Sequence, residues 1–148
     1  MKLYKLYSNN SEFKDVNFND GFNVVLGEVS NETNLDNDAH NLGKSTLISL
    51  IDFMLLKELK KDHFLKKETF KNYIFYMEIK LNSGEYVTIK RPVAKNTKIS
   101  LAKHNNENYD AREWEQWDYT DLSLGTKDKE SNPKEILNRW LGFDVLVG

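Results

Sequence analysis

The sequence predicts an α/β fold of the α+β type, in which a mixed or antiparallel sheet packs against one long helix. Two stretches, residues 2–26 and 73–103, hold short runs of β-branched and aromatic residues that are typical of strands. Between them, apolar residues from Leu47 to Leu59 recur at helical spacing and cover more than one side of the helix. A chain of 148 residues without a linker-like stretch is expected to form one domain, residues 1–148.

The first part of the chain is expected to supply three strands and then a loop. Residues 2–7 and 12–18 carry spaced apolar and aromatic side chains, and the turn signal Asn-Asp-Gly follows the second run. Residues 22–26, a short apolar run that ends at a glycine, are expected to form a buried strand. Residues 28–38 are polar and acidic, so we expect them to form a loop.

After the long helix, a hairpin sheet and a C-terminal helix are expected. The turn sequence Asn-Ser-Gly-Glu separates two strand-like runs, and a third run follows. Asn132 and Pro133 are typical of a helix start, and Gly142 is typical of a helix end. No pattern decides the structure of the tryptophan-containing segment 110–128. The expected elements are strands at residues 73–81, 86–91 and 97–103, which form a hairpin sheet over residues 73–103, and a helix at residues 133–141.

The composition narrows the class of protein. The formal net charge of −2 gives no bulk electrostatic reason to expect nucleic-acid binding. The absence of cysteine excludes disulfides and thiolate metal sites, and it fits a cytoplasmic location. The first residues hold no apolar signal core, and no run reaches about 18 apolar residues, so we expect neither a secretory leader nor a membrane partner.

The motif Gly43-Lys44-Ser45-Thr46 lies where the expected loop gives way to the long helix. That order suits a phosphate-binding loop, because the positive end of the helix and its backbone N–H groups face the anion. Gly43 allows the backbone to approach closely, and Lys44 reaches the β- and γ-phosphates. Ser45 is then the natural Mg²⁺ ligand, and Thr46 donates to the α-phosphate.

The upstream half of this loop departs from the usual spacing. Glycine is expected at position 38 and often at position 41, where the chain has Asp38 and Asn41. Asn41 tolerates the left-handed backbone that a glycine would adopt. Asp38 would repel a triphosphate, so we interpret residues 28–38 as an insertion that bulges outward. The anion cradle of this Walker A segment, residues 38–46, is then formed by His40, Asn41, Leu42 and Gly43.

These residues resemble the opening of an ABC-type ATPase head of the SMC and RecN kind, which has a P-loop NTPase fold. The likeness rests on the lead-in "DGFNVVLG", the loop "HNLGKST" and the hairpin sequence "YIFYMEIKLNSGEYVTIKRPV". The loop variant is similar to that of a bacterial subgroup of SMC-like proteins associated with DNA repair or antiphage defence. The resemblance implies that ATP and Mg²⁺ are cofactors, with Lys44, Ser45 and the cradle from His40 to Thr46 at the phosphates. It also implies that residues 8–11 lie near the adenine or ribose.

The resemblance also implies which parts this chain lacks. Such a head hydrolyses ATP only with a glutamine loop, a signature turn and a Walker B strand that ends in Asp-Glu. The strand containing Met77-Glu78 is a hairpin strand, so Glu78 is expected on a solvated face, and "LSLGT" at residues 122–126 lacks the helix that follows a signature. We therefore interpret the chain as an N-terminal half that binds ATP weakly and does not turn it over. Its implied partners are a C-terminal half, a second head in a dimer and, through the whole protein, DNA.

The lysine-rich segment, two histidines and two tryptophans have simpler structural explanations than a functional role. Residues 57–71 hold six lysines against three acidic residues, and a solvated face is favoured over contact with a DNA backbone. His63 and His104 share no metal-binding spacing with His40 and are expected on the surface. Trp114 and Trp117, three residues apart, are expected to pack in the core rather than to stack on bases.

Two other classes of function stay open. In the first, the protein is a non-catalytic interaction domain, and the degenerate loop only begins a core helix. In the second, it is another small P-loop NTPase, such as a kinase or a GTPase. The chain has no Asn-Lys-x-Asp base reader and no arginine-rich lid, which disfavours this second class.

Overall fold

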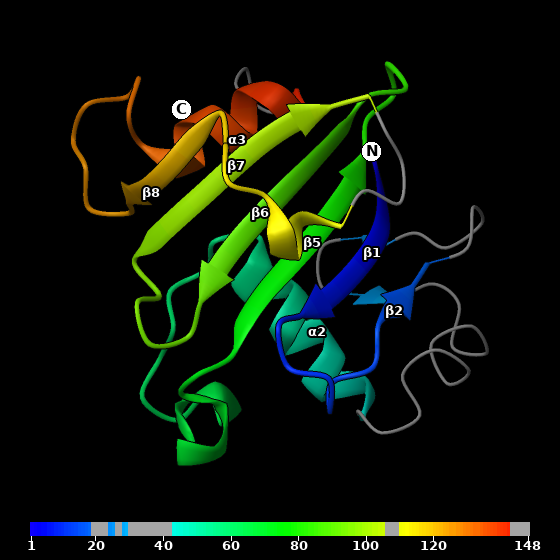
Figure 1. The fold of residues 1–148 in the computed structure, drawn as a ribbon, viewed down its shortest axis with the longest axis vertical. Coiled ribbons are helices and arrows are strands. Elements are labelled where there is room, and N and C mark those ends of the chain that lie inside the picture. Colours follow the sequence, from blue (N-terminus) through cyan, green and yellow to red (C-terminus); the bar gives the residue numbers. More distant parts are fainter. Residues whose placement is uncertain (19–23, 26–27, 30–42, 106–109, 143–148) are drawn as a thin grey trace.

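The computed structural model describes residues 1–18, 24–25, 28–29, 43–105 and 110–142. Within these residues the protein has an α+β fold, in which a six-stranded sheet carries two α-helices against one face (Figure 1). The order of strands is β2-β1-β5-β6-β7-β8, and each strand is antiparallel to its neighbours. The strands of this sheet are β1 (Lys2–Ser8), β2 (Val16–Asn17), β5 (Ile74–Lys80), β6 (Tyr86–Pro92), β7 (Lys98–His104) and β8 (Tyr119–Ser123).

Both α-helices pack on the same apolar face of the sheet. α2 (Lys44–Met54) lies behind the sheet in Figure 1, and α3 (Pro133–Leu141) packs near β7. Their buried leucines and isoleucines join one core with Met77, Ile89 and Leu101 of the strands. Each such side chain contributes about 1.5–3 kcal/mol when it is fully buried, so this core is the main source of stability. Short 3-10 helices are present at η1 (Phe64–Lys66), η2 (Glu68–Phe70) and η3 (Ala111–Glu113).

The expected hairpin sheet is confirmed, but it is only the centre of a larger sheet. β5 and β6 pair from Ile74↔Pro92 to Lys80↔Tyr86, and β7 adds the third strand. Gly84 closes the turn with a φ of 92°, a conformation that glycine adopts without strain. The N-terminal strand β1 pairs with β5 at one edge, and β8 pairs with β7 at the other. The sheet predicted over residues 73–103 included neither β1 nor β8.

The strand expected to lead into the phosphate loop is placed differently from the prediction. Its described part, β3 (Val24–Val25), pairs with β4 (Glu28–Val29) in a two-stranded antiparallel sheet that is separate from the six-stranded one. Every strand pairing among the described residues is antiparallel, so the mixed sheet that the sequence allowed is not found. The two residues between β3 and β4, 26 and 27, lie outside the described part. The expectation of a loop from residue 28 is therefore wrong for residues 28–29, and residues 30–38 lie outside the described part.

The long helix ends earlier than its apolar pattern predicts. The N–H of Leu56 donates to Phe53 O at 3.0 Å, and the N–H of Lys57 donates to Asp52 O at 3.1 Å. These two bonds form a Schellman motif, and Leu56 occupies the left-handed position, with a φ of 72°, that glycine usually holds. Leu56 is fully buried, which offsets the strain of about 1–2 kcal/mol. The apolar spacing up to Leu59 thus continues in a packed turn rather than in a helix.

The C-terminal helix agrees with its sequence signals. The Asn132 side chain accepts from Lys134 N at 2.9 Å and from Glu135 N at 3.3 Å, and Pro133 is the first helical residue. Gly142 ends the helix with a φ of 82°. The helix predicted at residues 133–141 is therefore confirmed together with both of its caps.

Candidate functional site

The motif Gly43-Lys44-Ser45-Thr46 forms the start of α2. Gly43 is the N-cap, with an extended backbone (φ −60°, ψ 157°), and its carbonyl accepts the N–H of Leu47 at 3.0 Å. Among the residues that the structure describes, no side chain caps the helix, and its first turn carries no acidic residue. Ser45 is exposed and Thr46 is half-buried. The positive end of the helix dipole therefore has neither a side-chain cap nor a local carboxylate among its own residues, and it suits an anion.

Only part of the predicted phosphate loop lies in the described structure. Gly43, Lys44, Ser45 and Thr46 are placed together on the first turn of α2 or at its cap. His40, Asn41 and Leu42, which were predicted to complete the cradle, lie outside the described residues, as does Asp38. The role of Ser45 as an Mg²⁺ ligand, and the roles predicted for Lys44 and Thr46, stay predictions.

The fold itself does not require glycine at position 43. Its φ is negative, and a Cβ atom built there would meet Thr46 Oγ1 at 3.9 Å, which is an ordinary contact distance. Alanine at this position is therefore compatible with the described backbone and its neighbours. A need for glycine, if one exists, comes from a ligand that approaches the backbone. Substitution of Gly43 can therefore distinguish an effect on ligand binding from an effect on folding.

A cleft of about 410 Å³ runs beside α2 from its N-terminus. On the far side of the cleft, His63 Nδ1 accepts the N–H of Leu65 at 3.1 Å, which leaves the proton of the neutral ring on Nε2. His63 was expected on the surface and is half-buried. Lys57 pairs with Asp52 across 3.6 Å, and the carboxylates of Glu58 and Asp62 also line the cleft. The residues that line the cleft include Ser45, Thr46, Ser49 and Asp52 of α2 and Lys57, Lys60 and His63 of the following segment.

Arg91 fixes the C-terminal end of α2 against the sheet. Its Nη1 donates to Phe53 O at 2.6 Å and to Lys57 O at 2.7 Å, and its Nε donates to Asn96 O at 2.7 Å. The guanidinium lies 4.1 Å from the centre of the Phe53 ring. Burial lowers the pKa of Arg91 to about 10, so the side chain stays charged at neutral pH, where it complements the negative end of the helix.

The buried position of Arg91 was not predicted, although the alternating pattern of β6 indicated it. Arg91 follows Val87 and Ile89 at alternate positions of β6, so it shares their buried face. An arginine at an inward-facing strand position needs several acceptors, because its charge is otherwise costly to bury. Carbonyl groups at a helix C-terminus supply such acceptors.

Glu78 and His104 contradict the surface positions predicted for them. Glu78 is fully buried, and its Oε1 lies 3.9 Å from His104 Nε2. Thr88 lies opposite Glu78 on β6, and its Oγ1 shares a hydrogen bond of 2.7 Å with His104 Nε2. The three side chains project from neighbouring strands on the face of the sheet opposite α2. Strand alternation indicated an outward face, but the chain covers that face with a later segment.

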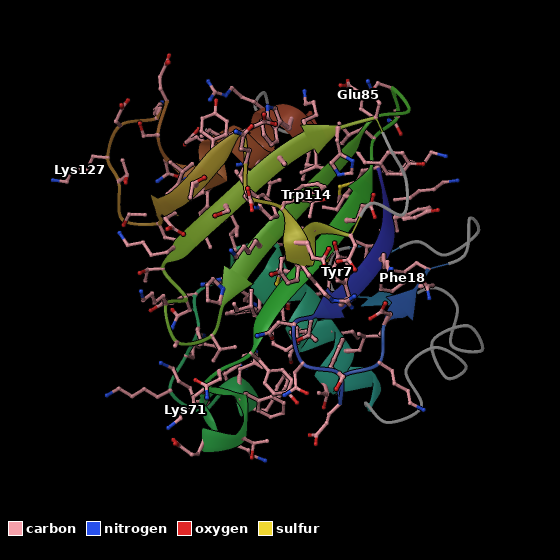
Figure 2. All side chains as sticks on the ribbon, viewed as in Figure 1. Tyr7, Phe18, Lys71, Glu85, Trp114 and Lys127 are labelled. Atoms are coloured by element: carbon pink, nitrogen blue, oxygen red, sulfur yellow. The ribbon has the colours of Figure 1, made fainter. Side chains whose placement is uncertain are left out.

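Residues 110–117 form this cover, and Figure 2 labels Trp114 in the cover and Tyr7 on β1, which the cover packs against. Tyr7 Oη accepts the N–H of Ala111 at 3.0 Å, and Arg112 Nε donates to Ser8 O at 2.8 Å. Trp114 and Trp117 contact each other, with ring centres 4.9 Å apart, and both pack against the aromatic cluster of Tyr7 and Tyr76. Core packing of the two tryptophans is therefore confirmed, although η3 ends before Trp114 and no helix joins them.

A second cleft of about 620 Å³ opens beside this cover. It is bounded by His104 and Trp114, and three carboxylates, those of Glu113, Glu115 and Asp118, line it together with Lys103. Asp118 already accepts the N–H of Lys103 at 2.8 Å. Among the described residues, no group of three or more histidine or acidic side chains is arranged to hold a metal ion.

Residues 8–11, which the resemblance places near adenine or ribose, form the turn after β1. Ser8 is buried, and its Oγ accepts the N–H of Asn10 at 3.1 Å. None of these residues lines the cleft beside Ser45 and Thr46. The sequence "LSLGT" lies at the end of β8 and in the turn after it, and α3 begins only at Pro133. It therefore does not have the turn-then-helix arrangement of a signature.

None of the described helices has the length and apolar character needed to cross a membrane. The likeness to ATPase heads stays a prediction from the sequence. Comparison of the chain with protein-family models, with curated proteins and with solved structures finds no match in any of the three.

Proposed function

We propose that this chain is the ATP- and Mg²⁺-binding N-terminal portion of an SMC- or RecN-like ATPase with a P-loop NTPase fold, which acts on DNA in repair, maintenance or antiphage defence. One observation carries the proposal. The motif Gly43-Lys44-Ser45-Thr46 begins a core helix whose N-terminus has no side-chain cap and adjoins an open cleft. An anion bound there would be favoured by the helix dipole and by the free N–H groups of the first turn.

The order of elements supports the same proposal. Two strands, β1 and β2, precede β3, the motif opens α2, and the antiparallel hairpin β5–β6 follows. This is the order that the resemblance to ATPase heads implies. β3 pairs with β4 in a separate two-stranded sheet, so the support comes from the order of elements along the chain and not from the pairing of β3.

The test is a titration of a fluorescent ATP analogue with Mg²⁺ into the wild-type chain and its variants. Lys44→Ala is expected to weaken binding by roughly tenfold or more, because it removes the charge that meets the β- and γ-phosphates. Ser45→Ala is expected to lower the Mg²⁺ dependence of binding more than the affinity without Mg²⁺. Equal affinities for wild type and Lys44→Ala would overturn the proposal.

Gly43→Ala provides a matched control for folding. The backbone at position 43 accepts alanine, so we expect only the small fall in unfolding midpoint that replacing an N-cap glycine with alanine causes, together with weaker binding of the analogue. Lys127→Ala, an exposed substitution in a different part of the chain, is expected to change neither property. Weaker binding by Lys127→Ala would assign the effect to overall charge instead of to the motif.

Hydrolysis is a separate part of the proposal. The chain is expected to show no steady turnover of ATP, because the signature turn and Walker B acid belong to the missing C-terminal half and the second head. Phosphate release by the purified chain can be measured with and without Mg²⁺. Robust Mg²⁺-dependent release that Lys44→Ala abolishes would refute the half-head interpretation while keeping the nucleotide site.

The alternative is a non-catalytic interaction domain with a degenerate phosphate loop. It is favoured by Asp38 and the acidic segment before it, which oppose a bound triphosphate. Absence of analogue binding by the wild type would support this alternative. Competition by GTP as strong as that by ATP would instead favour another small P-loop NTPase.

A further inference from the structure

The segment from Lys57 to Lys71 is basic in a chain that is acidic overall. It holds six lysines against Glu58, Asp62 and Glu68, whereas the whole chain has a formal net charge of −2. All six lysines are exposed. Lys57 pairs with Asp52 and Lys71 pairs with Glu68, but no ion pair joins Lys60, Lys61, Lys66 or Lys67 to any described residue.

The fold holds this basic segment in a defined shape. Leu65 is fully buried between the lysines, and the rings of Phe64, Phe70 and Tyr73 pack edge to face at 5.1–5.4 Å. His63 caps η1 through the N–H of Leu65. The lysines therefore project from an anchored surface, which loses less conformational entropy on binding than a flexible tail would lose.

A second segment brings further lysines to the same end of the sheet. Arg91 bonds both Lys57 O and Asn96 O, so the start of the basic segment and the turn between β6 and β7 are held together. That turn and its edge carry Lys95 and Lys98, which are both exposed. Figure 1 shows η1, η2 and this turn at the lower end of the molecule. We call this surface, Lys57–Lys71 with Lys95 and Lys98, the basic end.

The basic end has charge without an apolar anchor. Phe64 and Phe70 are half-buried and pack against the core. Among the described residues the one large exposed apolar side chain is Met1, whose amino group bonds Asn82 in the turn at the other end of β5 and β6. Stable binding to a lipid surface needs buried apolar area in addition to charge. A phosphate backbone needs only the charge, so it fits this surface better.

We propose that the basic end is a docking surface for the phosphodiester backbone of duplex nucleic acid. Exposed lysines would contact phosphates and release their condensed counterions, which provides affinity without sequence preference. The inference goes beyond the proposed function, which names DNA but no surface that contacts it. Lys57 and Lys60 also line the cleft that begins at Ser45, so the basic end adjoins the proposed nucleotide site. The proposed contact between the basic end and a phosphate backbone does not depend on the nucleotide site, because it needs no bound nucleotide.

Two charge-matched variants test the proposal. The first replaces Lys61, Lys66, Lys67 and Lys95, none of which lines the cleft beside Ser45, with glutamine, and the second does the same to Lys2, Lys127, Lys129 and Lys134. All eight lysines are exposed, so both variants should keep the wild-type unfolding midpoint. Figure 2 shows Lys127 at a different end of the molecule from Lys71. Binding is measured by the anisotropy of a labelled DNA duplex, without nucleotide, over a series of KCl concentrations.

The first variant is expected to bind at least about tenfold more weakly at low salt, and the second to bind like the wild type. The slope of log affinity against log salt should fall in magnitude by about 0.9 for each lysine contact removed. Equal losses in both variants would overturn the proposal, because they would assign binding to overall charge. Absence of wild-type binding at 50 mM KCl, or binding to anionic phosphatidylserine vesicles but not to duplexes, would overturn it as well.

A duplex of RNA, used in the same assay, tests whether the basic end recognises the phosphodiester backbone itself. Comparable losses for RNA and DNA in the first variant support backbone recognition, whichever duplex binds more tightly. Titration of the fluorescent ATP analogue into the same two variants keeps the two proposals apart. The first variant is expected to retain analogue binding within about threefold, because its four lysines are not those of the motif. Loss of analogue binding in Lys44→Ala with intact duplex binding would separate the proposals in the other direction.

Discussion

The two faces of the six-stranded sheet are buried by different means. The face toward α2 and α3 is apolar across β1, β5, β6 and β7, and Arg91 is its charged exception. The opposite face carries tyrosines, Glu78, Thr88 and His104, and residues 110–117 cover it with two tryptophans. Burial on the first face depends mainly on area, whereas burial on the second depends on matched hydrogen bonds and charges.

This difference indicates how each face responds to change. An apolar face tolerates changes of shape and loses stability in proportion to the volume removed. A polar buried face loses stability when one partner is deleted, even if the shape is kept. Substitutions chosen on each face therefore test whether the two faces lose stability for these different reasons.

The largest effect is expected from Phe75→Ala on the α2 face. Phe75 is fully buried and contacts the rings of Phe13, Phe53 and Tyr73. Removing it should lower the free energy of unfolding by about 3–5 kcal/mol, measured by urea titration with a fixed m-value. A loss below about 1 kcal/mol would mean that this face is not the principal core.

Arg91→Met tests the charged exception on that face. Methionine keeps much of the apolar stem, but it removes the Arg91 donor from Phe53 O, Lys57 O and Asn96 O, of which Phe53 O keeps the N–H of Leu56. We expect the free energy of unfolding to fall by about 2–4 kcal/mol, with increased hydrogen exchange at the end of α2. Lys90→Met, the neighbouring position on the other face, serves as the control and should cost far less. Equal losses for the two variants would contradict the role given to Arg91.

Tyr7→Phe deletes one hydrogen-bond partner on the second face with almost no change of shape. It leaves the buried N–H of Ala111 without its acceptor at 3.0 Å. The expected loss is about 1–3 kcal/mol of unfolding free energy, with greater proteolysis near residues 110–117. An unchanged stability would indicate that the second face behaves like the apolar one.

Trp117→Ala is the matched aromatic truncation on the second face. Trp117 is half-buried and packs against Tyr76, Trp114 and the Lys90 ammonium. Because less of its surface leaves water, we expect a loss of about 1–2 kcal/mol, which is below that of Phe75→Ala. A loss equal to that of Phe75→Ala in the same urea titration would show that the two faces contribute equally.

The smallest effect is expected from alkaline pH. Burial raises the pKa of Tyr7 well above its ordinary value of 10.0, so the folded state holds the phenolic proton more tightly than the unfolded state. The stability that this provides is complete below pH 10 and is lost as pH rises toward the folded pKa. At pH 10.5 the loss is up to about 1 kcal/mol, and it should be smaller in Tyr7→Phe. Comparison of the two proteins cancels the contribution of Arg91, which is present in both.

The turns and helix caps that depend on a few neighbouring residues were predicted from the sequence. The turn at Gly84 and the caps Asn132 and Gly142 act within a few residues, and the structure confirms them. The end of α2 was not predictable from spacing, because Leu56 adopts a left-handed conformation only where tertiary burial offsets the strain. Glu78 was predicted to be exposed because its strand alternates, and its cover comes from residues far along the chain.

The candidate site was predictable only in part, for a similar reason. The motif from Gly43 to Thr46 was found because its residue types and the following helix are local properties. The cleft beside it depends on the segment after α2 and on the bonds that Arg91 makes, and neither has a sequence signature at the motif. The cradle residues His40, Asn41 and Leu42 lie outside the described residues, so that part stays a prediction.

The pairing of β1 with β5 has a consequence for synthesis on the ribosome. β1 ends at Ser8, and its main partner begins only at Ile74, so the first strand waits for the chain between them to be made. At roughly 5–20 residues per second, that wait lasts several seconds. α2 is also completed before β5 and β6, which cover its apolar side. During translation the helix that carries the candidate site therefore exposes its leucines to solvent. These leucines would be the main binding site for a chaperone.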